Sequence, residues 1–138
     1  MYINDFIRYS YMGWLVDGNK KLKDWQIQLI QKNERIGIGI SAISCWEVAK
    51  LVEIGRLKFK CSIEEWMSDS LKYPGIHLLE LTPQISIESC NLPDNFHKDP
   101  ADQIIVATAR SYDLFLLTSD IEILNYSYVK TFKEEGTC

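Results

Sequence analysis

The chain has 138 residues, of which 46% are hydrophobic and 25% are charged, a balance typical of one globular domain. Its net charge of −4 argues against a protein that coats nucleic acid by neutralising phosphates, because such proteins are usually basic. No apolar run approaches the ~18–20 residues that span a bilayer, and the start lacks a secretory signal. We therefore expect a single cytoplasmic domain over residues 1–138.

Apolar residues recur with helical spacing in some segments and form short runs in others. In chain order we expect a helix over 20–34, a strand over 36–40, a helix over 42–54, a helix from 62 to about 72, a strand over 77–81, a helix from 82, a polar loop over 92–98, a helix from 99 to about 112, a strand over 114–118, a short helix over 120–125 and a strand over 128–132. The boundary signals are Asn19, Ser62 and Thr82 as N-caps and Gly55 just after a helix.

Helices that alternate with apolar strands predict an α/β fold, here a three-layer domain with a mostly parallel central sheet. In such sheets, ligands bind at the carboxyl ends of the strands. The four cysteines form no C-x-x-C pair and lie far from His77 and His97, which argues against a zinc site. We expect free thiols in a reducing compartment.

Three acids occur near the predicted carboxyl ends of strands or at helix starts. Glu47 lies about two turns into the helix after strand 36–40, Asp102 lies in the first turn of its helix, and Asp120 follows strand 114–118. If the sheet is parallel, these acids converge on one edge, where they repel one another unless a cation lies between them. Hard oxygen ligands favour Mg²⁺ or Mn²⁺, and such an ion suits phosphodiester hydrolysis.

Each acid also has a purely structural explanation. Glu47 could pair with a cap at Ser44 or be a solvated helix residue. Asp99 fits an N-cap, and Asp102 could merely favour the helix dipole. Asp120 could cap the short helix that follows it. Only the joint placement of the acids points to a site.

The sequence resembles the PIN-domain ribonucleases, most closely the toxin half of VapC-type toxin–antitoxin pairs. Residues 97–109, H-K-D-P-A-D-Q-I-I-V-A-T-A, are similar to the family run H-x-D-P-x-D-x-x-I-x-A-T-A, its most distinctive segment. Residues 40–49, I-S-A-I-S-C-W-E-V-A, are similar to I-S-x-x-[ST]-x-W-E-[LIV]-A. Weaker matches, in the same order along the chain, are residues 55–57, 73–76, 81–83 and 117–120.

This resemblance implies a PIN-like fold and a metal-dependent endoribonuclease that cleaves structured RNA. It implies Glu47, Asp102 and Asp120 as ligands of Mg²⁺ or Mn²⁺, Thr118 as a residue that positions water or metal, and Asp99 as an accessory or structural acid. It also implies a small cognate antitoxin that covers the acidic groove, and a homodimer.

The start of the chain departs from the family pattern, which has an acid at the end of the first strand, about six residues before a tryptophan. Arg8 occupies that place before Trp14, while Asp5 lies nine residues before it. Asp5 could supply the acid. Alternatively, a frameshift has altered residues 8–14. One possible set of codons for Arg-Tyr-Ser-Tyr-Met-Gly-Trp, read one base later, encodes D-T-H-T-W, which contains the family's acid.

Other residues have two interpretations. The basic residues Arg56, Lys58 and Lys60 suit a solvated loop or an RNA phosphate contact. Trp46 and Trp66 suit the core or a dimer interface, and His97 suits a loop or cap rather than a general base.

Two rival functions remain open. The first is a PIN-fold protein without catalysis that still binds its antitoxin, which the altered first strand favours. The second, a receiver-like phospho-acceptor domain, is disfavoured because Lys130 falls inside the predicted last strand rather than beyond it.

Overall fold

The computed structural model describes residues 5–7, 23–33, 37–118 and 120–133. In these segments helices and strands alternate. The elements are β1 Asp5–Ile7, α2 Asp24–Asn33, β2 Ile38–Ser41, α3 Ala42–Glu53, α4 Ile63–Leu71, β3 Ile76–Leu79, α5 Pro83–Ser89, the short 3-10 turn η1 Pro93–Asn95, α6 Pro100–Tyr112, β4 Phe115–Leu117 and α7 Ile121–Leu124. None of the helices in these segments has both the length and the apolar character needed to cross a bilayer.

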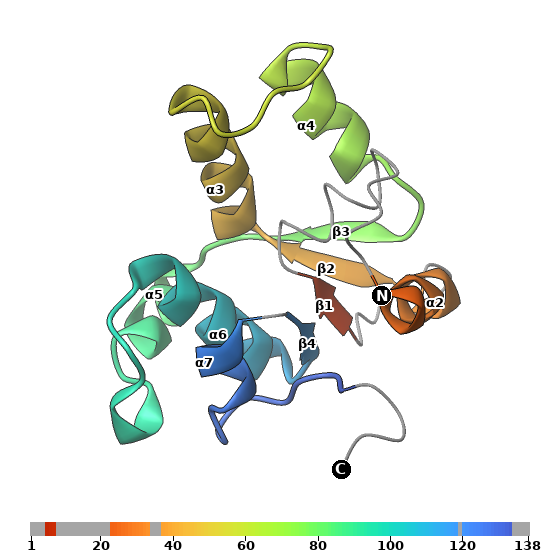
Figure 1. Cartoon of the computed structure of the whole chain (residues 1–138). Coiled ribbons are helices and arrows are strands. Elements are labelled where there is room, and N and C mark those ends of the chain that lie inside the picture. The colour runs from red at the N-terminus through yellow and green to blue at the C-terminus, as the bar shows by residue number, and fades with distance from the viewer. Residues whose placement is uncertain (1–4, 8–22, 34–36, 119, 134–138) are drawn as a thin grey trace.

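The sheet is parallel throughout its four strands, in the order β3-β2-β1-β4 (Figure 1). The central strand β1 was not among the predicted elements, because three residues carry too little periodicity to be recognised. Its last residue, Ile7, is level with Ile40 of β2 and Leu117 of β4. The carboxyl ends of these three strands therefore meet at one edge, as the predicted α/β class requires.

Two predicted segments differ from the structure. The strand expected over 128–132 is reduced to one parallel bridge between Leu116 and Thr131, in which Leu116 N donates to Lys130 O and Phe132 N donates to Leu116 O. The loop expected over 92–98 contains the η1 turn. The N-cap predicted at Asn19 lies outside the described residues, whereas the Ser62 and Thr82 caps are confirmed, each accepting a backbone N–H three residues later.

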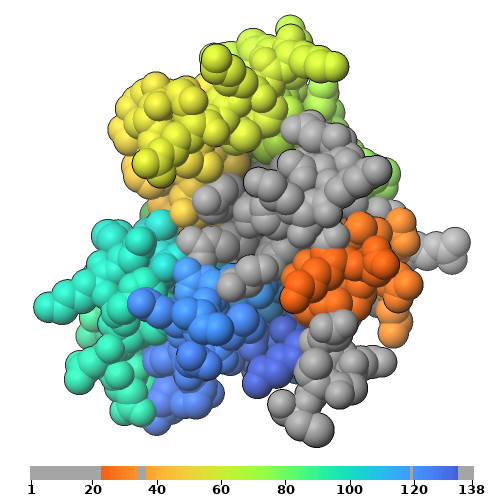
Figure 2. Space-filling view, viewed as in Figure 1, coloured from red at the N-terminus to blue at the C-terminus, as the bar shows by residue number. Residues whose placement is uncertain are grey.

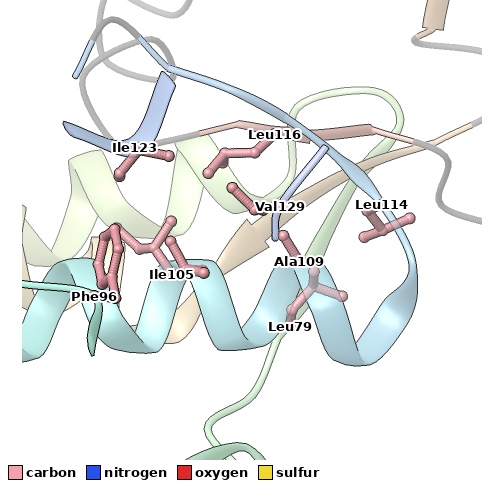
Figure 3. Close-up of a cluster of buried hydrophobic side chains, with 9 residues drawn as sticks. Leu79, Phe96, Ile105, Ala109, Leu114, Leu116, Ile123 and Val129 are labelled. Carbon is pink, nitrogen blue, oxygen red and sulfur yellow. The ribbon is translucent and has the colours of Figure 1, made fainter. Parts of the chain in front are cut away.

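Each face of the sheet is covered by helices, which gives the predicted three layers. Along β4, Leu116 and Leu117 point to opposite faces, so each belongs to a different buried cluster. Figure 3 shows the cluster between α6 and the sheet, where Leu116 packs near Ile105 and Ile123. The cluster on the other face includes Ile30, Ile38, Ile40, Val48, Trp66 and Leu117.

The surface reflects the same arrangement. In Figure 2 the yellow-green surface of α3 and α4 lies above the turquoise and blue surface of α5, α6 and α7, with α2 in orange to the right. α3 also contacts α6. The two groups of helices thus lie next to each other along the edge of the sheet where β2 and β4 end.

Replacing Ile105 by Ala should destabilise the protein by about 2–5 kcal/mol, because this fully buried side chain would leave a cavity against α7 and β4. Ile87→Ala is the matched control, since Ile87 is 59% exposed and its loss should cost no more than about 0.5 kcal/mol. Urea unfolding followed by circular dichroism measures both. Equal midpoints for the two variants would contradict the assigned core.

Candidate active site

Glu47 is placed by a helix that begins directly at the end of β2. Ser41 is the N-cap of α3, and its Oγ accepts a hydrogen bond from the backbone N–H of Ile43 at 3.3 Å. Ser44 is buried inside the helix, so the alternative in which Ser44 caps it is wrong. Glu47 is half-buried, and its Oε1 atom is shielded from solvent. A carboxylate in such a place requires polar partners.

Asp102 is placed by the sharp start of α6. Asp99 is the N-cap, as predicted, and its Oδ1 accepts from the backbone N–H groups of Ala101 at 3.0 Å and Asp102 at 3.3 Å. Pro100 follows at the first helical position, where its missing N–H costs nothing. Asp102 is therefore in the first turn, only 4% exposed, where the helix dipole favours its negative charge.

The end of β4 places the third acid. Thr118 is buried, and its Oγ1 accepts from the backbone N–H of Asp120 at 3.1 Å. Asp120 caps α7, with Oδ1 accepting from Glu122 N at 2.9 Å and Ile123 N at 3.2 Å. The structural role weighed for Asp120 is thus confirmed. One hydroxyl and one carboxylate together fix how the chain leaves the sheet.

His97 connects the first turns of α6 and α7, a role that its assignment as a loop or cap residue missed. Its Nε2 atom lies 3.2 Å from Asp102 Oδ2 and 3.1 Å from Glu122 Oε2, with a well-formed hydrogen bond to neither. Its Nδ1 accepts the backbone N–H of Asp99 at 3.4 Å. The hydrogen therefore lies on Nε2, facing both carboxylates.

Glu122 was not singled out from the sequence at all. It follows Asp120 by two residues and lies on a four-residue helix too short to show a pattern. The only available signal was the Asp120-x-Glu122 spacing, which places two acids at one helix start. Together with Asp102, these acids give the edge of the sheet a concentrated negative charge.

The acids do not form a ready-made metal centre. Within residues 5–7, 23–33, 37–118 and 120–133, no group of three or more His, Cys, Asp or Glu side chains is arranged to hold a metal ion. None of Glu47, Asp102 and Asp120 is without a partner. The donor set still suits a hard divalent cation in its chemistry, since all three are carboxylates from elements around one edge. Their role as metal ligands remains a prediction.

The strand register decides where Asp5 lies. Asp5 is level with Ile38 and Phe115, the first residues of β2 and β4. Asp5 therefore lies two residues, or about 7 Å, from the carboxyl end of β1. The residue that follows the last residue of β1 is Arg8, which lies outside the described part of the chain.

Other predicted features have mixed outcomes. Trp66 belongs to the core and stacks on Phe59 with ring centroids 4.3 Å apart, whereas Trp46 is 56% exposed on α3.

Cys45, Cys61 and Cys90 are free, as expected, while Cys138 lies outside the described residues. Burial raises the pKa of the Cys45 thiol, which keeps this neighbour of Glu47 uncharged. The basic run Arg56, Lys58 and Lys60 is exposed.

Comparisons with known proteins agree with the fold. The family model for the PIN domain matches residues 10–127. "Ribonuclease VapC22" of Mycobacterium tuberculosis is 28% identical over 91 residues, which cover 66% of this chain and 68% of the relative.

Two solved structures are similar in fold. VapBC2 from Rickettsia felis, bound to a DNA fragment from its promoter, has a TM-score of 0.68 at 13% identity, covering 94% of this chain and 98% of that one. DNA-bound VapBC from Salmonella typhimurium has a TM-score of 0.67 at 14% identity, covering 94% and 97%. At such low identity, these likenesses establish the fold alone.

Replacing Asp99 by Ala should cost about 1 kcal/mol, because the first N–H groups of α6 lose their acceptor. Asp99→Ser should retain most of the stability, since a serine hydroxyl can cap a helix. Asp69→Ala is the control, because Asp69 is exposed near the end of α4, where a negative charge is unfavourable. Urea unfolding compares the three variants. A serine variant as unstable as the alanine variant would argue against the cap.

Proposed function

Because the chain belongs to the PIN-domain family, we propose that it is a VapC-type ribonuclease toxin that hydrolyses RNA phosphodiester bonds with Mg²⁺ or Mn²⁺ and is restrained by a small antitoxin. The observation that carries the proposal is the meeting of the first turns of α6 and α7 at His97. This contact brings the Asp102 and Asp120 segments to the same edge of a parallel sheet, where α/β proteins place their ligands. The name of the mycobacterial relative, a ribonuclease, supports the same chemistry.

In this proposal Glu47, Asp102 and Asp120 hold the cation. A bound divalent ion activates water and neutralises the charge that develops on phosphate. The protein's own contribution is orientation. His97 holds the Asp102 carboxylate, and Thr118 fixes the backbone of Asp120 while its own hydroxyl proton is left to orient a water molecule. His97 is not assigned as the general base, because its Nε2 atom is buried and faces the carboxylates of Asp102 and Glu122.

A second candidate function follows from the strand register. Asp5 is level with the amino ends of its neighbours, and the residue after β1 is a cation, Arg8, where the family pattern has an acid. A positive charge there would repel a metal cation and compete with it for the carboxylates of the site. The chain would then be an impaired ribonuclease that keeps the fold and the antitoxin-binding surface.

Arg8→Asp should therefore raise the affinity for Mn²⁺ at least tenfold, because it replaces a repelling charge with a ligand at the end of β1. Isothermal titration calorimetry measures the affinity, and hydrolysis of a labelled RNA measures the activity. Asp5→Asn is the matched control and should change neither. If Asp5→Asn instead removed metal binding in the unaltered chain, Asp5 would be the missing acid. The nucleotide sequence of codons 8–14 tests the frameshift separately, because codons that cannot encode D-T-H in the shifted frame would exclude it.

The partner is tested by co-expression with the adjacent small open reading frame. We expect a stable complex that elutes earlier than the chain alone, because an inserted guanidinium would neutralise the acidic edge around Asp102 and Glu122. Asp102→Asn with Glu122→Gln should weaken that complex, and light scattering should report an even number of toxin chains in it. A toxin that purifies without any small partner from its own operon would contradict the proposal.

A further inference from the structure

An open depression of about 550 Å³ lies beside His97. It is formed by the end of α5, the η1 turn and the first turns of α6, and its walls include Cys90, Asn95, Phe96, His97, Lys98 and Gln103. His97 belongs to both places, since its ring lines the depression while Nε2 contacts Asp102 and Glu122. Gln103 is the residue next to Asp102. The depression therefore adjoins the proposed site of hydrolysis directly.

Among the residues that line the depression, Lys98 is the only lysine or arginine. Arg110, Lys130 and Lys50 are each paired with an acid at 3.0 Å or less. Lys98 is exposed and makes no ion pair with any residue in the described part of the chain. An uncommitted cation beside an acidic edge suits a ligand that is itself an anion. It would offset the repulsion that the acids exert on a phosphate.

The remaining walls suit a nucleobase. Gln103 and Asn95 offer amide donors and acceptors, and Phe96 and Leu92 supply apolar surface. Clefts of about 300–1,000 Å³ with a few convergent polar groups are typical small-ligand sites. Proteins that recognise RNA by sequence hold unstacked single-stranded bases in this way, through hydrogen bonds to the base edges.

We propose that this depression binds the nucleotide next to the cleaved phosphodiester, with its phosphate on Lys98 and its base against Gln103 and Asn95. The inference rests on the proposed ribonuclease function and adds the place where the RNA sequence is recognised. It also explains how a chain with a net charge of −4 accommodates a polyanion, since one cation lies where the backbone of the RNA would enter.

The test measures RNA binding without hydrolysis. Fluorescein-labelled hexamers of uridylate and adenylate are titrated in EDTA, and anisotropy gives the dissociation constants. Lys98→Ala should weaken binding of both hexamers three- to tenfold and reduce the salt dependence by about 0.7 in the log–log slope. Lys98→Arg should restore binding, and Lys32→Ala, which removes an equivalent exposed charge on α2, should leave it unchanged.

Two further variants test the base contact. Gln103→Leu keeps the size of the side chain but removes its hydrogen bonds, so it should reduce the preference between the two hexamers. Cys90→Trp should fill the depression and weaken binding at least fivefold, whereas Ile87→Trp, on an exposed position of the same helix, should not. Thermal melts of every variant confirm folding.

The outcomes separate the two proposals. If the unaltered chain binds or cleaves RNA and the depression variants behave like it, the nucleotide site is wrong while the ribonuclease function stands. If the variants lose RNA binding as expected but neither the unaltered chain nor Arg8→Asp cleaves RNA with Mn²⁺, the nucleotide site stands and the ribonuclease function is wrong. A chain that binds no RNA overturns both.

Discussion

The structure depends on the pairing of one three-residue strand, β1, with β2 on one side and β4 on the other. These two strands do not pair with each other, so the sheet is continuous only through β1. Because both pairings are parallel, the chain leaves β2 and β4 at the same edge. The first turns of α3 and α7 then begin there, and α6 starts there because its helix must run back to enter β4.

Negative charge is concentrated at this edge, and local contacts offset the unfavourable free energy of burying it. Asp102 is nearly buried, and a buried carboxylate is destabilising unless it is paired or hydrogen-bonded. The helix start and His97 provide that compensation. Capping and ligand binding are compatible roles, because a carboxylate has two oxygens and about four lone pairs. In Asp120, both capping hydrogen bonds of α7 are accepted by one oxygen, Oδ1.

The fold and the site tolerate change in β1 differently. Backbone N–H and C=O groups form the strand pairing whatever the side chains are, so the departure of this segment from the family pattern leaves the pairing of residues 5–7 intact. A cation site depends instead on which side chain stands at the end of the strand. The chain belongs to the PIN-domain family. Under the proposed function, Arg8, which follows β1 in the sequence, is expected to weaken metal binding.

The sequence by itself determined the elements whose signals are local. Asp99-Pro100, Ser62 and Thr82 marked helix starts to within a residue, because a cap acts on N–H groups only two or three positions away. The acids Glu47, Asp102 and Asp120 were also recognised from spacing and resemblance, although their function is not shown by position alone.

Tertiary structure decided what depends on distant partners. Three residues become β1 because strands from elsewhere in the chain flank them on both sides, whereas the strand expected over 128–132 is reduced to one bridge with Leu116. The contact of His97 with Glu122 joins residues 25 positions apart, which no local pattern encodes. Likewise, only the register shows that Asp5 is level with the amino ends of its neighbours, because the alignment of two strands is set by their packing and not by either sequence alone.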